Sequence, residues 1–164
     1  MQIPWSESPA IRPLADADIA DLAEIEKEAP SAWSTSAIAA ELMQKSGVQL
    51  VSSMGNTPSG WLCCRVNGFE AELLKVTVSR KCRRKGVATR LLSYLEKELA
   101  EHGVSELFLE VRSSNVSAIT FYLQVGFTEV GRRIRYYRQP IDNALLFKKK
   151  LECLEYRGNH ERNS

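Results

Sequence analysis

The sequence predicts an α/β protein whose sheet mixes antiparallel and parallel strands. The clearest helix signal is an apolar residue at every fourth position from Val87 to Leu99. Apolar strand patterns stand on both sides of this helix, at residues 69–78 and 107–111. A strand, a helix and a second strand form a βαβ unit, in which the two strands run parallel. The pair Asn67-Gly68 marks a tight hairpin, so the strands on either side of it should be antiparallel.

The first part of the chain is expected to hold a short strand and a helix. Residues 11–14 form the strand. Asp16 has a side chain suited to an N-cap, and the apolar pattern then predicts a helix over residues 17–28. In this prediction, Glu26 and Lys27 lie on the outer side of the helix.

The remaining elements follow in order. Ser34 or Thr35 is expected to cap a second helix that runs to Met43. Gly126 is expected to end a later helix over residues 117–125. The other strands are predicted at residues 48–53, 60–66, 127–137 and 145–151. The pattern predicts one domain over residues 1–152, followed by a polar C-terminal tail over residues 153–164.

Composition narrows the possible function classes. The net charge is only +2, which is too small to predict bulk nucleic-acid binding. The four cysteines form no C-x-x-C pair and only two histidines accompany them, so we expect no metal site. Nothing in the sequence demands disulfides, which fits a cytoplasmic protein. The sequence shows no signal-peptide pattern and no apolar stretch long enough for a membrane span, so no membrane partner is expected.

A short basic loop precedes the central helix, at Arg83, Arg84 and Lys85. The first backbone N–H groups of a helix have no intrahelical acceptor, and the helix dipole favours negative charge there. Gly86 and Ala88 are small, so a phosphate could approach the backbone closely. The loop therefore predicts an anion site, most plausibly for a pyrophosphate, although a solvated basic turn would have the same composition.

Two residues have side chains suited to acid–base chemistry. Glu110 stands in the apolar strand Leu107–Val111, where a carboxylate costs desolvation energy unless it is paired or has a role. It is a candidate general base, or else a solvent-facing residue or a structural partner of Arg112 or another arginine. Tyr122 shares a helix face with Ala118, and is either a general acid or an aromatic core residue with a hydrated hydroxyl.

Together these segments resemble a known family. Arg83-Arg84-Lys85-Gly86-Val87-Ala88 resembles the [RQ]-x-x-G-x-[GA] signature of the GCN5-related N-acetyltransferases (GNAT), which bind acetyl-CoA there. Leu109-Glu110-Val111-Arg112, followed by Asn115, Ala118, Tyr122 and Gly126-Phe127, looks like the later part of the same motif set. The resemblance implies the GNAT fold, a mixed and mostly antiparallel sheet with about four helices. Its central parallel pair would splay at the cofactor site.

Within that family, the sequence resembles the RimI-type branch, the ribosomal-protein alanine N-acetyltransferases. The resemblance implies transfer from acetyl-CoA to a protein N-terminus, with Glu110 as general base and Tyr122 as general acid. The implied acetyl-CoA contacts are Val76, Thr77, Val78, Arg83, Arg84, Lys85, Gly86, Val87, Ala88, Thr89, Asn115, Ala118 and Tyr122. The implied acceptor contacts are Trp33, Tyr136 and Tyr137. Departures from the family pattern before Trp33 and after Tyr137 both bear on the acceptor side.

Two alternatives stay open from the sequence. The acceptor could be a lysine side chain or a small amine. The chain could also be an acyl-CoA-binding module that catalyses nothing. The resemblance implies no metal, and we expect a monomer or a weak dimer.

Overall fold

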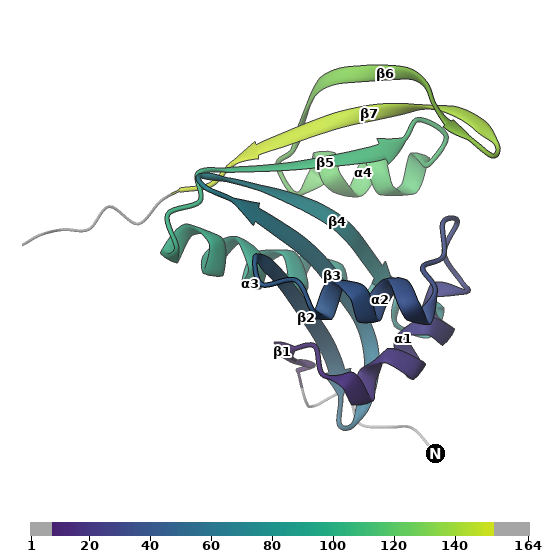
Figure 1. The fold of residues 1–164 in the computed structure, drawn as a ribbon, viewed down its shortest axis with the longest axis vertical. Helices are drawn as coiled ribbons and strands as arrows, with labels where there is room; N and C mark the ends of the chain where they lie inside the picture. The colour runs from purple at the N-terminus through teal and green to yellow at the C-terminus, as the bar shows by residue number, and fades with distance from the viewer. Residues whose placement is uncertain (1–7, 153–164) are drawn as a thin grey trace, which may run out of the picture.

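A computed structural model describes residues 8–152 of the chain, in which seven strands form one sheet (Figure 1). The strand order is β1-β2-β3-β4-β5-β7-β6. The strands are β1 (Ala10–Pro13), β2 (Gly47–Met54), β3 (Thr57–Asn67), β4 (Glu70–Val78), β5 (Glu106–Arg112), β6 (Thr128–Arg138) and β7 (Ile141–Lys150). The α-helices of the described part are α1 (Ile19–Glu26), α2 (Thr35–Leu42), α3 (Val87–Glu101) and α4 (Val116–Gln124). Two short 3-10 turns are η1 (Asp16–Asp18) and η2 (Arg80–Cys82).

The predicted fold class is confirmed. Only β4 and β5 pair in parallel among the described strands, and all other neighbours are antiparallel. The helix between β4 and β5 is α3, as the βαβ pattern predicted. The predicted C-terminal tail lies outside the described residues. Within residues 8–152, every helix is too short or too polar to span a lipid bilayer.

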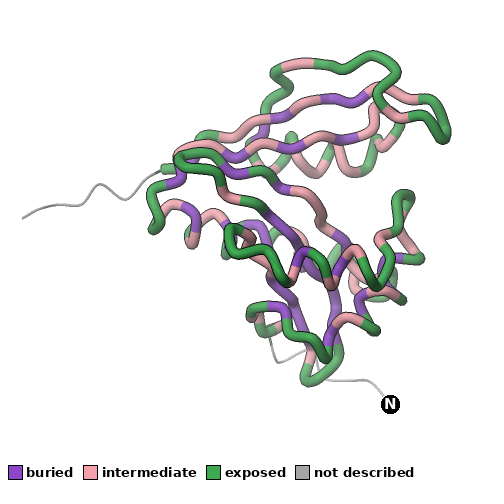
Figure 2. The backbone as a smooth tube through the Cα atoms, in the orientation of Figure 1, coloured by how far each residue is buried: buried purple, intermediate pink, exposed green. Residues whose placement is uncertain are grey.

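Helices cover both faces of the sheet. Leu91, Leu95 and Leu99 of α3 are buried in the core on one face, and residues of α4 pack against the same core. Helices α1 and α2 pack on the other face, in a core that includes Trp61. The burial pattern in Figure 2 follows this arrangement, with long buried stretches in β2 and β3 and a mostly exposed β6. The neighbouring Cys63 therefore contributes to one core and Cys64 to the other.

The parallel strands separate toward their carboxyl ends. Pairing between β4 and β5 stops at Glu72 and Phe108. Directly after this point, the register between β3 and β4 shifts, because Cys64 lies opposite Leu73 whereas Cys63 lies opposite Lys75. A bulge of this kind bends the strand that carries it. The rest of β4, up to Val78, therefore has a partner strand on one side only, and a gap opens between β4 and β5.

Of the two predicted helix caps, one is confirmed and one is wrong. Ser34 caps α2 by accepting a hydrogen bond from the backbone N–H of Ala37. Asn115 caps α4 in the same way. The predicted cap at Asp16 is wrong, because Asp16 lies inside the turn η1 and α1 begins only at Ile19. The acidic side chain that bonds to Arg12 and Ala15 before α1 is that of Asp18, two residues later.

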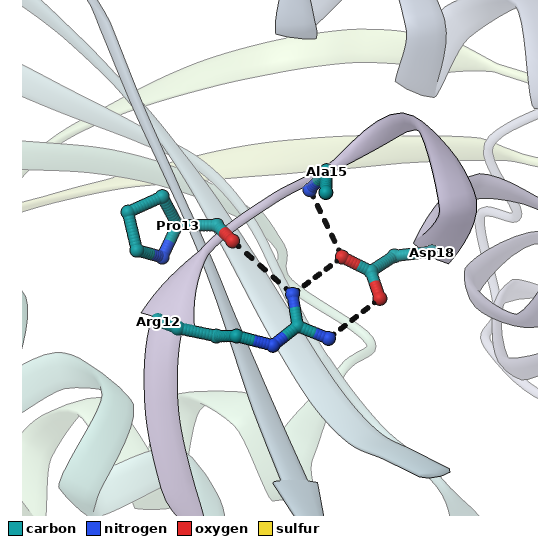
Figure 3. Close-up of polar contacts among 4 residues, drawn as sticks. All are labelled: Arg12, Pro13, Ala15 and Asp18. Atoms are coloured by element: carbon teal, nitrogen blue, oxygen red, sulfur yellow. Dashed lines mark hydrogen bonds and ion pairs between the residues drawn. The ribbon is translucent and has the colours of Figure 1, made fainter. Parts of the chain in front are cut away.

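Asp18 joins the first strand to the start of α1. Its carboxylate accepts two hydrogen bonds of 2.7 Å from the guanidinium of Arg12 and one of 2.9 Å from the backbone N–H of Ala15 (Figure 3). The same guanidinium also donates to the carbonyl of Pro13. The hydrogen bonds from Arg12 are the main reason that the pKa of Asp18 lies below its ordinary value.

We expect Asp18→Asn to lower the free energy of unfolding by about 1 kcal/mol at pH 7, since Arg12 is partly exposed and its ion pair is screened. A carboxylate with a lowered pKa stabilises the fold above its unfolded pKa of about 3.9, and this contribution is lost as the pH falls through the folded pKa. Urea unfolding at pH 7 and at pH 3 should therefore show the difference between the two proteins shrinking at pH 3. An equal difference at both pH values would contradict this assignment.

Candidate active site

A groove of about 530 Å³ opens where β4 and β5 separate. Six regions of the chain line it: the loop between α1 and α2, the second half of β4, the loop before α3 at Arg83, the end of β5, the start of α4 and the end of β6 at Tyr137. Many residues that the sequence singled out meet here. They are Trp33, Val76, Thr77, Val78, Arg83, Glu110, Asn115, Ala118, Tyr122 and Tyr137.

The other predicted cofactor residues do not line this groove. Arg84, Lys85, Gly86, Val87, Ala88 and Thr89 form the loop and first turn of α3. Lys85 and Val87 line a separate hollow of about 420 Å³. Of the predicted acceptor residues, Tyr136 is half exposed and stands outside the groove, with its ring edge-on to Tyr137 at 5.2 Å between centroids.

The start of α3 has the geometry of an anion site. Gly86 has a φ of +76°, in the left-handed region, and a Cβ added there would meet nothing within 4 Å. The N–H of Arg90 donates to the carbonyl of Gly86 and is the first to make the i to i−4 bond. The preceding N–H groups of the helix, from Val87 to Thr89, therefore have no intrahelical acceptor. The open space at Gly86 and the small side chain of Ala88 are features that favour the approach of a phosphate to a helix start.

Glu110 points away from the α3 side of the sheet. In β5, Leu107, Leu109 and Val111 are buried, whereas Glu110 lies on the alternate face with its side chain 23% exposed. Its Oε1 lies 3.2 Å from Nε of Arg133. The sequence left a partner such as Arg112 open, and the structure pairs Glu110 with an arginine of β6 instead. The carboxylate is thus both ion-paired and on the wall of the groove.

Arg112 has a different role. Its guanidinium donates to the carbonyls of Gln139 and Pro140 and lies 4.1 Å from the ring centroid of Tyr137. These contacts join the end of β5 to the turn between β6 and β7. They hold the aromatic ring of Tyr137 on the wall of the groove.

Tyr122 of α4 also lines the groove. Its ring packs edge-on against Phe127, with 5.6 Å between centroids. Desolvation raises the pKa of Tyr122 to about 12. The phenol is therefore protonated throughout the neutral range and can donate a proton or a hydrogen bond.

One buried group in the groove has no partner. Thr77 of β4 is buried, and its Oγ1 makes no hydrogen bond within the described part of the protein. A buried hydroxyl without a partner costs free energy, which a bound ligand could recover. This hydroxyl, the unpaired edge of β4 and the accessible start of α3 form three features suited to a long polar ligand that ends in phosphates.

A buried ion pair fixes the loop between α1 and α2. Glu26 is fully buried, and its carboxylate accepts from Nε1 of Trp61 at 2.8 Å and from the backbone N–H of Trp33 at 2.9 Å. Nζ of Lys75 lies 3.0 Å from the same carboxylate and donates to the carbonyl of Ser31. The prediction that Glu26 faces outward is therefore wrong. Sequence reasoning missed this network, although Glu26 follows the buried Leu22 by four positions, which places both on one helix face.

Asp142 is a second residue that sequence reasoning missed. Its carboxylate accepts hydrogen bonds from the hydroxyls of Ser113 and Ser114, and these lower its pKa to about 2. The contact ties the start of β7 to the turn before α4. A Ser-Ser pair before a helix and an aspartate in a hairpin are each too common to have predicted this contact.

Two neighbouring cysteines of β3, Cys63 and Cys64, are buried. Burial raises the pKa of Cys63 and raises that of Cys64 to about 12, so neither is a thiolate at neutral pH. Residues 8–152 contain no group of three or more His, Cys, Asp or Glu side chains that could hold a metal ion.

The lining of the groove includes the carboxylate of Glu110 and the protonated phenol of Tyr122, at the open end of a parallel strand pair. A carboxylate can take up a proton and a phenol can give one, so the chemistry open to this groove includes group transfer with acid–base assistance. A family model described as the acetyltransferase (GNAT) family matches residues 19–127. The chain belongs to this family, as its sequence motifs predicted.

Individual relatives agree with this membership. The chain is 43% identical over 68 residues to [ribosomal protein bS18]-alanine N-acetyltransferase of Escherichia coli K12, a match that covers 42% of this chain and 46% of that protein. This chain thus spans about half the length of the curated relatives that it matches. The crystal structure of the Escherichia coli ribosomal-protein-S18-alanine N-acetyltransferase has a TM-score of 0.80 and 27% identity, and covers 88% of this chain and 94% of that chain. Ard1 from Thermoplasma volcanium shares the fold, with a TM-score of 0.80 at 23% identity. The match covers 87% of this chain and 97% of the Ard1 chain.

Proposed function

We propose that the protein transfers the acetyl group of acetyl-CoA to the N-terminal α-amino group of a protein, such as a ribosomal protein. The observation that carries the proposal is the groove, which brings Glu110 and Tyr122 to the same space as the free edge of β4. The relationship to bacterial alanine N-acetyltransferases supports an N-terminal acceptor. A ribosomal acceptor would also place the protein in the cytoplasm.

The proposed chemistry uses two side chains. The pKa of a free α-amino group is about 8, so the group is largely protonated at neutral pH and cannot attack a thioester. Glu110 takes up this proton, directly or through a water molecule. A backbone N–H of the Val76–Val78 segment stabilises the negative charge that develops on the acetyl oxygen. Tyr122 gives a proton or a hydrogen bond to the departing thiolate.

Acetyl-CoA supplies the reactive thioester, and the residues present fit it. The N–H groups from Val87 to Thr89 would bind the pyrophosphate, with Arg84 and Lys85 adjacent. The free edge of β4 and the unpartnered hydroxyl of Thr77 would bind polar groups of the pantetheine arm. Arg83 has a structural part in this arrangement, since its Nε donates to the carbonyl of Val78 at 3.1 Å.

The direct test is acetyl transfer from labelled acetyl-CoA to a panel of acceptors, read by mass spectrometry. The panel contains peptides with a free N-terminal alanine, the same peptides with a blocked N-terminus and an internal lysine, and small amines. We expect acetylation of the free N-terminal peptides. Acetylation of lysine or small amines alone would overturn the N-terminal acceptor, and tight acetyl-CoA binding without any transfer would overturn the enzyme activity.

We expect Gly86→Glu to raise the Kd of acetyl-CoA at least about tenfold, because a side chain with a negative charge would enter the proposed phosphate site. Isothermal titration calorimetry measures this directly. Gly103→Glu is the matched control, since Gly103 stands just after the far end of α3 with a φ of +80° and also has nothing within 4 Å of an added Cβ. Equal affinities in the two variants would contradict the placement of the phosphates.

We expect Tyr122→Phe to lower kcat about 10- to 100-fold with little effect on acetyl-CoA affinity, because only the hydroxyl is removed. The effect should be smaller than that of losing the base, since a thiolate with a pKa of about 8.5 leaves readily. Tyr94→Phe, at a partly exposed tyrosine of α3, is the control. Full activity of Tyr122→Phe would remove the general-acid role.

A further inference from the structure

A second hollow, of about 580 Å³, lies beside the groove. Glu110 lines both, so the two spaces adjoin at this residue. The strand register explains how the lining forms, because Glu72 lies beside Phe108 and Glu110 lies opposite Leu146. Paired positions on neighbouring strands point to the same face of a sheet. In Figure 1, α1 and α2 lie over β2 to β4, and no described helix covers this face of β5 and β7.

This hollow has an apolar floor and an acidic rim. Phe108 and Leu146 are both partly buried and form the floor. Glu70 and Glu72 are exposed and stand at the rim. We call this space the acidic hollow.

The cations of the acidic hollow already have partners. Arg65 is held by Glu41, with Nε 3.2 Å from a carboxylate oxygen, and Glu72 adds a weaker interaction. Arg133 is paired with Glu110. Lys148, whose Nζ lies 5.9 Å from the ring centroid of Phe108, is paired with Glu106. The negative charge of Glu70 and Glu72 is therefore not balanced by the nearby cations, which are paired with other carboxylates. The acidic hollow should attract cations.

We propose that the acidic hollow binds the third to fifth residues of the acceptor chain and favours Lys or Arg there. The inference rests on the proposed function, in which the acceptor amine lies at Glu110. A strand advances about 3.3 Å per residue, so Phe108 and Glu72 lie about 7 Å along the sheet from Glu110. Glu70 lies beside Glu106, four residues before Glu110, and so about 13 Å from Glu110 along the strand direction. If the first residue of an extended acceptor lies at Glu110, its third residue reaches Glu72 and its fifth reaches Glu70. Side chains of an extended chain point alternately to opposite sides, so those of the third and fifth residues point to the same side.

Arginine side chains suit this space in two ways. Their aliphatic stems can lie on the apolar floor while the guanidinium groups reach the rim carboxylates. A glutamate at the same position would be repelled by Glu70 and Glu72. The preference should weaken as salt is added, since the rim is exposed.

The test compares N-terminal alanine peptides that differ only at the third and fifth positions, which hold Arg, Ala or Glu. We expect kcat/KM to be about tenfold higher for the Arg peptide than for the Glu peptide. Moving the two Arg residues beyond the eighth position should abolish the preference. The double variant Glu70→Gln/Glu72→Gln should bring the Arg-to-Glu ratio close to one, whereas Glu101→Gln, at the exposed end of α3, should keep it.

The outcomes separate the two proposals. A ratio near one in the wild-type protein, or a ratio that survives in the double variant, overturns the acidic hollow as a binding site while the peptides are still acetylated. Failure to acetylate any peptide overturns the proposed function, and this inference with it. Thermal unfolding of the double variant checks that its fold is intact.

Discussion

Glu110→Gln is expected to lower kcat about 10²- to 10⁴-fold, the range for loss of a positioned general base. The amide keeps the size of the side chain but cannot take up the proton that the acceptor ammonium must lose before it attacks. Acetyl-CoA affinity should change little, because the proposed phosphate contacts lie at the start of α3. Steady-state kinetics with an N-terminal peptide, together with calorimetry for acetyl-CoA, measures both quantities.

The same strand offers a matched control. Glu106 lies four residues before Glu110 in β5, has a similarly exposed side chain, and pairs with Lys148 at 3.0 Å. Glu106→Gln removes a comparable ion pair outside the groove, so its kcat should stay near that of the wild-type protein. The loss in Glu110→Gln should also shrink above about pH 8, where the acceptor amine is increasingly deprotonated without help. Equal turnover in the two variants would remove Glu110 from the mechanism.

The sequence predicted those features that depend on local pattern. The spacing of the apolar residues in α3 and the hairpin signal at Asn67-Gly68 are both local. The helix appears where expected, and the hairpin turn lies one residue later, at Gly68-Phe69, because Asn67 pairs with Glu70. The βαβ unit also follows from the order of elements alone, and it accounts for the groove at the open end of β4 and β5. The candidate residues Glu110 and Tyr122 were selected by motif, and the fold places both at that groove.

The missed features depend on contacts between distant segments. Arg133 reaches Glu110 because β6 lies beside β7, and the register between β6 and β7 shifts just after Arg133. No local pattern indicates that pairing. Glu26 was assigned to the outer face because charged residues are rarely buried, yet Lys75 from β4 supplies its counter-charge. A charged residue can thus be buried when a residue distant in the sequence supplies the opposite charge, which its residue type alone does not predict.

Glu26→Leu is expected to lower the free energy of unfolding by about 3–5 kcal/mol. Lys75 is largely buried, so the substitution leaves its charge without a partner, and it also leaves the indole N–H of Trp61 unpaired. Urea unfolding at pH 7 measures the loss. The loop that carries Trp33 should loosen as well, because its N–H loses the carboxylate. KM for the acceptor peptide should therefore rise more than the Kd of acetyl-CoA.

Two further variants test the cause of this loss. The double variant Glu26→Leu/Lys75→Leu removes both charges, so it should recover a large part of the stability that the single variant loses. Glu41→Leu is the matched control from α2, because Glu41 is also buried but its partner Arg65 is about half exposed. Arg65 can return to water, so this loss should be smaller. A double variant as unstable as Glu26→Leu would mean that the lost hydrogen bonds of Trp33 and Trp61, and not the unpaired charge of Lys75, account for the effect.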